Sequence, residues 1–203
     1  MDIKTQEESL SAAIYVHGLA SGSEAATFKK LQRKFKQYEW IAEDFGEDLA
    51  QNVKQLNEMI AKYNPEFVLG TSMGGLAVLF ADAPNATKVV INPAIHIADC
   101  IRDTIGIGTH PYFCKRQDGA TEFTLTEEMC RDYEFYITTH EIQLGKENYA
   151  VFALHDELLG DEASTVAQKL LAEQGYRVII DNDGAHRVQP STFEIIKHEV
   201  FKL

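Results

Sequence analysis

A serine between two glycines is the residue of this sequence best suited to chemistry. Residues 70–74 read Gly-Thr-Ser-Met-Gly, and apolar runs precede and follow them. This pattern predicts that a strand turns sharply into a helix, with glycines on both sides of the serine because the two backbones touch there. Such a turn gives Ser72 a strained backbone and an exposed hydroxyl beside the helix N-terminus. Those properties suit a nucleophile.

The same turn has two less reactive interpretations. Ser72 or Thr71 could be an ordinary N-cap, since Ser and Thr are preferred there, or the helix N-terminus could bind a phosphate. An N-cap, however, requires neither Gly70 nor Gly74. A Walker loop would have Lys after the last glycine and a dinucleotide site would read G-x-G-x-x-G, and residues 70–75 contain neither pattern. The nucleophile is the favoured interpretation.

A nucleophilic serine needs a base and an acid that orients the base. Asp156 directly follows the apolar run at 149–154, and His186 follows the run at 177–180 through a loop that contains Asp-Gly-Ala. The order Ser, Asp, His along the chain is the order expected for this kind of turn. We therefore predict a catalytic triad of Ser72, Asp156 and His186.

Two assignments within the triad have alternatives. Asp161 or another nearby carboxylate such as Glu157 could replace Asp156 as the acid, although Asp161-Glu162 is also typical of a first helical turn, where acidic residues are favoured. His186 is one of seven histidines, and we expect the others to be structural or exposed. Those six are His17, His96, His110, His140, His155 and His198.

The loop after the first apolar run is expected to complete an oxyanion hole. Gly18 allows this loop to approach the serine closely. We assign the two donors to the backbone N–H groups of Leu19 and Met73, with Ala20 as the alternative to Leu19; Met73 heads the helix, whose dipole stabilises negative charge. His17 precedes the serine in the chain, so it is expected to shape the loop by hydrogen bonding and not to act as the base.

Hydrophobic periodicity describes the elements that position these residues. Short apolar runs alternate with longer amphipathic segments, as in βαβ units around a parallel sheet. We expect six strands, at 12–16, 39–42, 67–69, 88–91, 149–154 and 177–180. Helices are expected at 24–37, 44–64, 73–82, 162–174 and 190–202.

A segment of about residues 97–147 interrupts this alternation. A loop of that length without structure is improbable in a compact domain, so we expect a small cap over one edge of the sheet, inside a single domain of residues 1–203. Its aromatic residues have two interpretations, an acyl pocket or the cap's own core, and the second is more common. They are Tyr112, Phe113, Phe123, Tyr133 and Phe135.

Composition excludes several classes of partner. The formal net charge of −12 over 203 residues disfavours nucleic acid and anionic membranes, which require clustered Lys and Arg. No apolar run is long enough to span a membrane, and the polar, acidic residues 1–10 do not resemble a signal peptide. We therefore expect a cytoplasmic protein. Three widely spaced cysteines are expected to be reduced thiols.

Several short motifs together resemble a known family. They are 17-HG-18, 70-GTSMGG-75, 91-INPA-94, 155-HDE-157 and 183-DGAH-186. With them the chain resembles the α/β-hydrolase superfamily over nearly its whole length, and more narrowly the small bacterial YqiA-like esterases. The INPA motif belongs to the narrower likeness, although a strand that ends at Asn-Pro explains those residues equally well.

The resemblance implies a fold and an activity. The fold would be a compact α/β-hydrolase with about six mostly parallel strands in the order 2-1-3-4-5-6 and a cap between strands 4 and 5. The activity would be hydrolysis of small-molecule acyl esters or thioesters through an acyl-enzyme, with no metal and no organic cofactor. An acyltransferase with the same triad, or a non-catalytic binding domain on this fold, are the alternatives.

Overall fold

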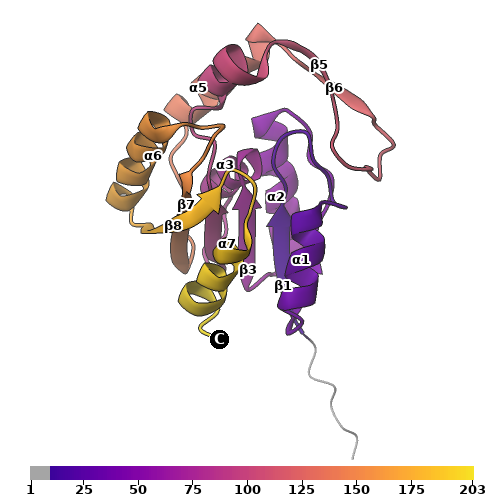
Figure 1. Ribbon diagram of the computed structural model, residues 1–203. Coiled ribbons are helices and arrows are strands. Elements are labelled where there is room, and N and C mark those ends of the chain that lie inside the picture. The colour runs from indigo at the N-terminus through magenta and orange to yellow at the C-terminus, as the bar shows by residue number, and fades with distance from the viewer. Residues whose placement is uncertain (1–9) are drawn as a thin grey trace, which may run out of the picture.

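The computed structural model describes residues 10–203 (Figure 1), so the polar N-terminal segment lies almost entirely outside the described residues. A central sheet has six strands in the order β2-β1-β3-β4-β7-β8, and every neighbouring pair is parallel. In chain order they are β1 (Ser11–Val16), β2 (Tyr38–Ile41), β3 (Phe67–Thr71), β4 (Thr87–Ile91), β7 (Glu147–His155) and β8 (Arg177–Ala185). The predicted sheet and strand order are confirmed.

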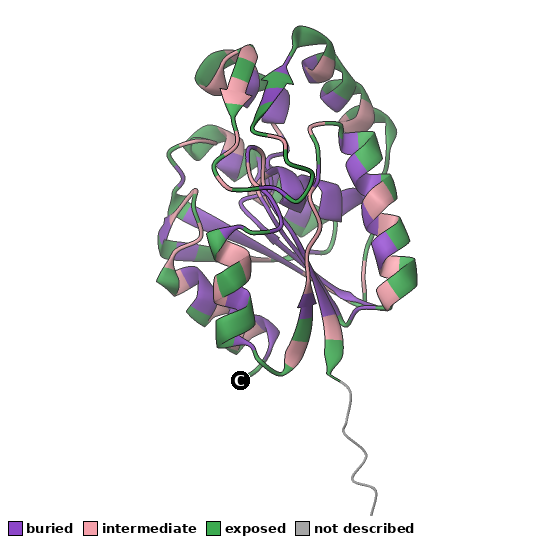
Figure 2. Cartoon of the chain, turned by 90° about the vertical axis from the view of Figure 1, so that its right-hand side faces the viewer, coloured by how far each residue is buried: buried purple, intermediate pink, exposed green. Residues whose placement is uncertain are grey.

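Helices cover both faces of this sheet, because alternate residues of each buried strand point to opposite sides. In β3, Phe67 and Leu69 pack into one apolar cluster and Val68 packs into the other. Figure 2 shows the buried strands at the centre of the molecule and exposed residues on the outer sides of the helices. The first cluster includes α1 (Ala26–Lys34), α7 (Pro190–Ile195) and the π-helical η2 (Ile196–Val200); the second includes α2 (Leu49–Tyr63), α3 (Met73–Phe80) and α6 (Asp161–Glu173).

Local signals set several helix ends. The Asp48 carboxylate accepts a hydrogen bond from the Gln51 N–H at 2.9 Å and caps the start of α2. The same helix ends at Asn64, whose φ of 43° is left-handed, just before Pro65. The end of α2 agrees with the predicted end at residue 64, but the helix begins at Leu49 and not at residue 44 as predicted.

The last strand is longer than predicted. We expected it to end at residue 180 and residues 181–185 to form a loop, but β8 continues to Ala185, and its pairing with β7 shifts register between Ala153 and His155. The polar Asp181 is tolerated in the strand because its buried carboxylate accepts hydrogen bonds from the hydroxyl groups of Ser191 and Thr192. The expected loop was wrong because the hydrogen-bond donors to Asp181 lie in α7, outside the residues of the strand.

The predicted cap is present between β4 and β7. It consists of α4 (Ile97–Cys100), the π-helical η1 (Ile101–Ile105), an antiparallel hairpin of β5 (Gly108–Pro111) and β6 (Glu122–Leu125), and α5 (Glu127–Thr139). Figure 1 shows α5 and the hairpin above the end of the sheet toward which the strands point. Phe123 and Tyr133 are buried in the cluster shared with α2 and α3, whereas Phe113 and Phe135 are exposed. Core packing is therefore the role of Phe123 and Tyr133.

Two properties expected from composition also have structural counterparts. All three cysteines, Cys100, Cys114 and Cys130, are free. In the part of the chain from residue 10 onward, no helix has both the length and the apolar character that crossing a membrane requires.

Candidate active site

Ser72 lies at the junction of β3 and α3 in a strained conformation. Its φ of 53° and ψ of −120° are unusual for a residue with a side chain. It occupies the N-cap position of α3, but its side chain makes no capping hydrogen bond. The ordinary N-cap interpretation is therefore wrong, and the strain presents a hydroxyl that the helix does not use.

Close backbone contacts explain the glycines on both sides of Ser72. A Cβ at Gly70 would overlap the Gly74 carbonyl, and one at Gly74 would overlap the carbonyls of Val16 and His17. Gly18, in the loop after β1, is less restricted, since its Cβ would lie 3.1 Å from the Ser72 Cβ, a tight contact without overlap. A side chain at Gly70 or Gly74 would therefore push the two backbones apart, whereas one at Gly18 would crowd Ser72.

Asp156 and His186 form a direct pair at the carboxyl ends of β7 and β8. Each Asp156 carboxylate oxygen lies 3.0 Å from the Nδ1 of His186. The carboxylate side chain is 3% exposed and the imidazole 14%, so this contact is largely shielded from water. Because Nδ1 donates to the carboxylate, the neutral ring carries its free lone pair on Nε2, where a general base needs it.

Asp156 is held in its ionised form. Burial alone would raise its pKa, but the hydrogen bond and charge of His186, together with the N–H groups of Leu159 and Leu158, lower the pKa overall. Asp161, the alternative acid, is exposed at the first residue of α6, and the described residues show no hydrogen bond between it and His186. The structure therefore brings Asp156 to the imidazole.

Asn92 was not anticipated as a site residue, yet it clamps the backbone around His186. It follows β4 in a left-handed conformation, with φ of 45°, and is buried. Its Nδ2 donates to the carbonyls of Ala185 and His186, at 3.1 and 3.2 Å, while its Oδ1 accepts from the Ala153 N–H at 2.7 Å. Asn92 thus joins the chain at His186 to the strand that leads to Asp156.

The same INPA segment also holds the serine. The Ser72 N–H donates to the Ile91 carbonyl at 2.9 Å, and the Ser72 carbonyl accepts from the Ala94 N–H at 3.2 Å. Ser72 and His186 are therefore both anchored to residues 91–94. The sequence signal was only the motif's likeness to the family, which named no role for Asn92.

Glu157, a nearby carboxylate in the sequence, contacts the backbone of the histidine. Its Oε2 accepts a hydrogen bond from the His186 N–H at 3.0 Å, and this bond lowers the pKa of Glu157. Within residues 10–203 no hydrogen bond joins the Ser72 hydroxyl to the His186 ring. Catalytic hydrogen bonds of this kind often form only when substrate binds.

His17 forms hydrogen bonds with the loops after β1 and β2. Its Nε2 accepts a hydrogen bond from the Phe45 N–H at 2.9 Å, so its proton is on Nδ1, which donates to the Gly18 carbonyl at 2.8 Å. Burial lowers the pKa of His17 to about 4. Both ring nitrogens are occupied, so His17 has no free nitrogen with which to act as a base.

The two expected oxyanion donors border one small cavity. Met73 is the first residue of α3, where a backbone N–H has no acceptor inside the helix. Leu19 lies in the adjacent loop beside Ala20, whose φ is 60°. The cavity has a volume of about 10 Å³, room for a single water or oxygen atom. Its lining includes Gly18, Leu19, Ala20, Met73 and Gly74.

Residues 12–199 match the model of a family described as "Uncharacterised protein family (UPF0227)". The chain belongs to this family. The matched range of the UPF0227 member contains Ser72, Asp156, His186 and the whole cap. No curated protein matches the sequence.

Within residues 10–203 no three His, Cys, Asp or Glu side chains are grouped so that they could hold a metal ion.

Solved structures confirm the fold of this UPF0227 member. The monoacylglycerol lipase of Paleococcus ferrophilus has a TM-score of 0.63 at 14% identity, covering 94% of this chain and 93% of its own. Est1E of Butyrivibrio proteoclasticus, solved with ferulic acid, has a TM-score of 0.62 at 15% identity, covering 98% and 91%. Mouse alpha/beta hydrolase domain-containing protein 10 has a TM-score of 0.60 at 13% identity, covering 93% and 87%. These matches confirm the expected α/β-hydrolase fold.

Proposed function

We propose that this protein is a serine hydrolase that cleaves small-molecule acyl esters or thioesters. The observation that carries the proposal is the strained Ser72, whose hydroxyl caps nothing and whose backbone shares the 91–94 anchor with the Asp156–His186 pair. Lipases and esterases among proteins of the same fold agree with this activity. The chemistry requires only the side chains and backbone N–H groups already described.

In the first half of the reaction, Ser72 attacks the carbonyl carbon of the substrate. His186 Nε2 takes the serine proton, and Asp156 orients the imidazole and stabilises its cationic form. The N–H groups of Leu19 and Met73 hold the oxyanion of the tetrahedral intermediate. When the intermediate collapses, the carbon–oxygen or carbon–sulfur bond to the leaving group breaks, and His186 gives the proton to the departing alcohol or thiol.

In the second half, water replaces the leaving group. His186 takes a proton from the water, whose oxygen attacks the acyl carbon of the Ser72 ester. The second tetrahedral intermediate releases the carboxylic acid, and the proton returns to the Ser72 oxygen. The enzyme is thereby restored, and one acyl ester has been converted to an acid and an alcohol.

Removal of the serine tests the proposal. We expect Ser72→Ala to lower kcat for p-nitrophenyl acetate by at least about 10³-fold, and a fluorophosphonate to add one phosphonyl group to Ser72 and none to the variant, as measured by intact mass. Ser11→Ala is the matched control, because Ser11 is exposed at the start of β1, whereas the loop beside Ser72 follows the other end of that strand. Near wild-type turnover by Ser72→Ala would refute the nucleophile.

Two further measurements separate the alternatives. A non-catalytic binding domain would give neither turnover nor a phosphonyl adduct on the folded protein. An acyltransferase would give new ester or amide products when alcohols or amines are added at millimolar concentration, at the expense of free acid. Under the proposal, free acid stays the main product, and a series of esters and thioesters of increasing acyl length identifies the preferred substrate.

A further inference from the structure

The backbone that bears the Leu19 N–H is fixed from both sides. On one side the Gly18 carbonyl accepts from His17 Nδ1 at 2.8 Å. On the other side the cap binds the loop, because the Phe113 N–H donates to the Ala20 carbonyl at 2.8 Å. One residue later the Ser21 carbonyl is held by another cap residue, Arg116. Part of the restraint on this loop therefore comes from a segment about 95 residues away in the chain.

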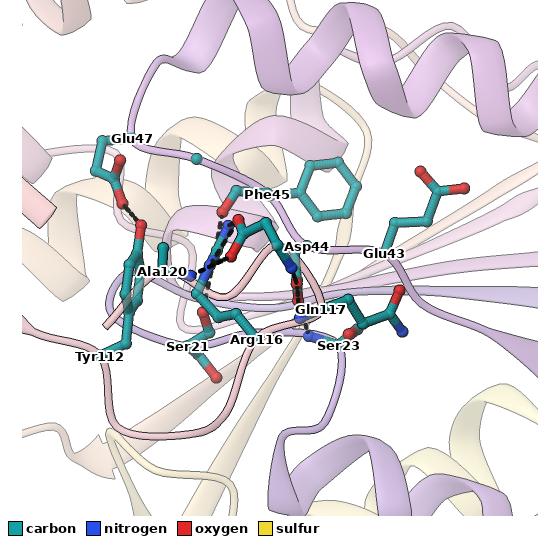
Figure 3. A network of polar contacts seen from close by, with 12 residues as sticks. Ser21, Ser23, Glu43, Asp44, Phe45, Glu47, Tyr112, Arg116, Gln117 and Ala120 are labelled. Atoms are coloured by element: carbon teal, nitrogen blue, oxygen red, sulfur yellow. Dashed lines mark hydrogen bonds and ion pairs between the residues drawn. The ribbon is translucent and has the colours of Figure 1, made fainter. Parts of the chain in front are cut away.

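Arg116 is buried where it joins three segments. The residue is 5% exposed, and its Nη1 donates to the carbonyls of Ser21, after β1, and Phe45, after β2, at 3.0 and 2.9 Å. Its charge is balanced by Asp118, which accepts from Nη2 at 2.6 Å. The guanidinium lies 4.3 Å from the centre of the Tyr112 ring. Figure 3 shows Arg116 pointing between the loops that carry Ser21 and Phe45.

Carboxylates of the β2 loop extend the same network. Asp44 accepts from the Ser23 N–H at 2.6 Å and from the Gln117 N–H, so it links the loop after β1 to the cap. Glu47 accepts from the Tyr112 hydroxyl. These bonds are drawn in Figure 3. Arg116 lies at the centre of the network and is the only arginine among the residues drawn. Its guanidinium donates to the Ser21 and Phe45 carbonyls.

We propose that Arg116 is a positioning residue for the oxyanion hole, and that the cap thereby completes the active site. This inference rests on the proposed serine hydrolase activity. Arg116 touches neither the nucleophile nor the Asp156–His186 pair in the described residues. It acts by holding Ser21, and with it the Leu19 N–H, in the position that the transition-state oxygen requires.

The expected consequence is a loss in kcat with little change in KM. An oxyanion donor contributes mainly when charge develops on the carbonyl oxygen, so a donor displaced by a fraction of an ångström costs transition-state stabilisation and little substrate binding. The Ser21 and Phe45 carbonyls, which now share the Nη1 donor, would also repel each other once the guanidinium is gone. We expect about a 10- to 100-fold fall in kcat.

Arg116→Met tests this, because it keeps the apolar stem and removes every donor. Its kcat for p-nitrophenyl acetate should fall by that factor, its KM should stay within about threefold, and the rate of fluorophosphonate labelling at Ser72 should fall in parallel. The matched control is Arg102→Met. Arg102 also belongs to the cap and pairs with carboxylates, Glu127 and Glu134, but contacts no residue of the loop after β1 among the described contacts. Its kcat should stay within about twofold of wild type.

Amide hydrogen exchange gives a readout that does not depend on activity. In Arg116→Met, the peptide spanning residues 17–22 should exchange about 10-fold faster or more, while Arg102→Met leaves it unchanged. If wild type shows no Ser72-dependent turnover but this exchange difference is found, the proposed function fails and the anchoring of the loop by Arg116 stands. If Ser72 is active but the exchange is equal in both variants, Arg116 has no positioning role.

Circular dichroism and thermal unfolding check that the variants are folded. Should Arg116→Met not fold, Arg116→Lys decides, because one ammonium at the end of a flexible chain does not reproduce the forked geometry. A folded Arg116→Lys with a several-fold lower kcat supports the proposal. A folded variant at Arg116 with wild-type kcat, or an equal loss in Arg102→Met, overturns it.

Discussion

Both oxygens of the Asp156 carboxylate lie 3.0 Å from the Nδ1 of His186, in a contact that is shielded from water. A carboxylate in this position selects the imidazole tautomer with its lone pair on Nε2, and in the proposed reaction it would stabilise the imidazolium. Replacement by an amide keeps the size of the side chain but loses both effects.

We therefore expect Asp156→Asn to lower kcat by about 10²- to 10⁴-fold without unfolding the protein. Asp161→Asn is the matched control, and its kcat should stay within about twofold, since Asp161 is exposed at the start of α6. Steady-state kinetics and a thermal melt of both variants are the measurements. The larger loss in Asp161→Asn would move the acid to residue 161.

Asn92 should affect catalysis through His186. Asn92→Asp keeps the shape and tolerates the left-handed backbone, but its carboxylate repels the carbonyls of Ala185 and His186 that the amide now binds. We expect about a 10-fold or greater loss in kcat and a lower melting temperature. Asn64→Asp is matched to it, being a left-handed asparagine at the end of α2, and should be nearly neutral. Equal kcat for all three proteins would contradict the clamp.

The glycines of the serine turn should not tolerate a methyl group. In Gly70→Ala the new Cβ would overlap the Gly74 carbonyl, so β3 and α3 would have to separate. We expect a loss of about 3 kcal/mol or more in the free energy of unfolding, or failure to fold. In Gly46→Ala the Cβ would have no neighbour within 4 Å, and the change should stay within about 1 kcal/mol. Urea titrations that give similar values for the two variants would contradict this account.

Acid should destabilise the protein partly through His17. Burial lowers the pKa of His17 to about 4 in the folded state, against an ordinary value of about 6.5. Between these values the unfolded chain binds a proton that the folded one does not, so the free energy of unfolding falls as the pH falls from about 6.5 to 4. The contribution is about 3 kcal/mol in total, and all of it is present above pH 6.5.

His17→Gln isolates that contribution, because glutamine offers a donor and an acceptor but does not titrate. Its free energy of unfolding, measured with urea at several pH values, should fall less steeply than that of wild type between pH 6.5 and 4.5. His198→Gln replaces an exposed histidine and should keep the wild-type slope. Parallel slopes for wild type and His17→Gln would show that His17 titrates normally in the folded protein.

Local patterns in the sequence were sufficient for the frame of the fold, and they also named the residues of the candidate site. Apolar runs of strand length alternate with amphipathic helices, which determines a parallel sheet. The glycines around Ser72 follow from steric contact within a few residues. Asp156 and His186 each follow a strand, and the carboxyl ends of parallel strands meet at one edge of a sheet, so chain position alone predicts that they lie near the serine.

Only the tertiary structure decided how that site is supported. Asn92 binds carbonyls about 93 residues away, and Arg116 binds one 95 residues away. The pattern of a sequence records whether a residue is apolar and where turns occur, but a single polar side chain carries no sign of its distant partner. For the same reason residues from Asp181 onward were expected to form a loop. Asp181 lies in β8 instead, where its carboxylate accepts a hydrogen bond from the Thr192 hydroxyl of α7. A polar group can be buried without a large energetic cost only when it is hydrogen-bonded, and whether partners lie within reach depends on the whole fold.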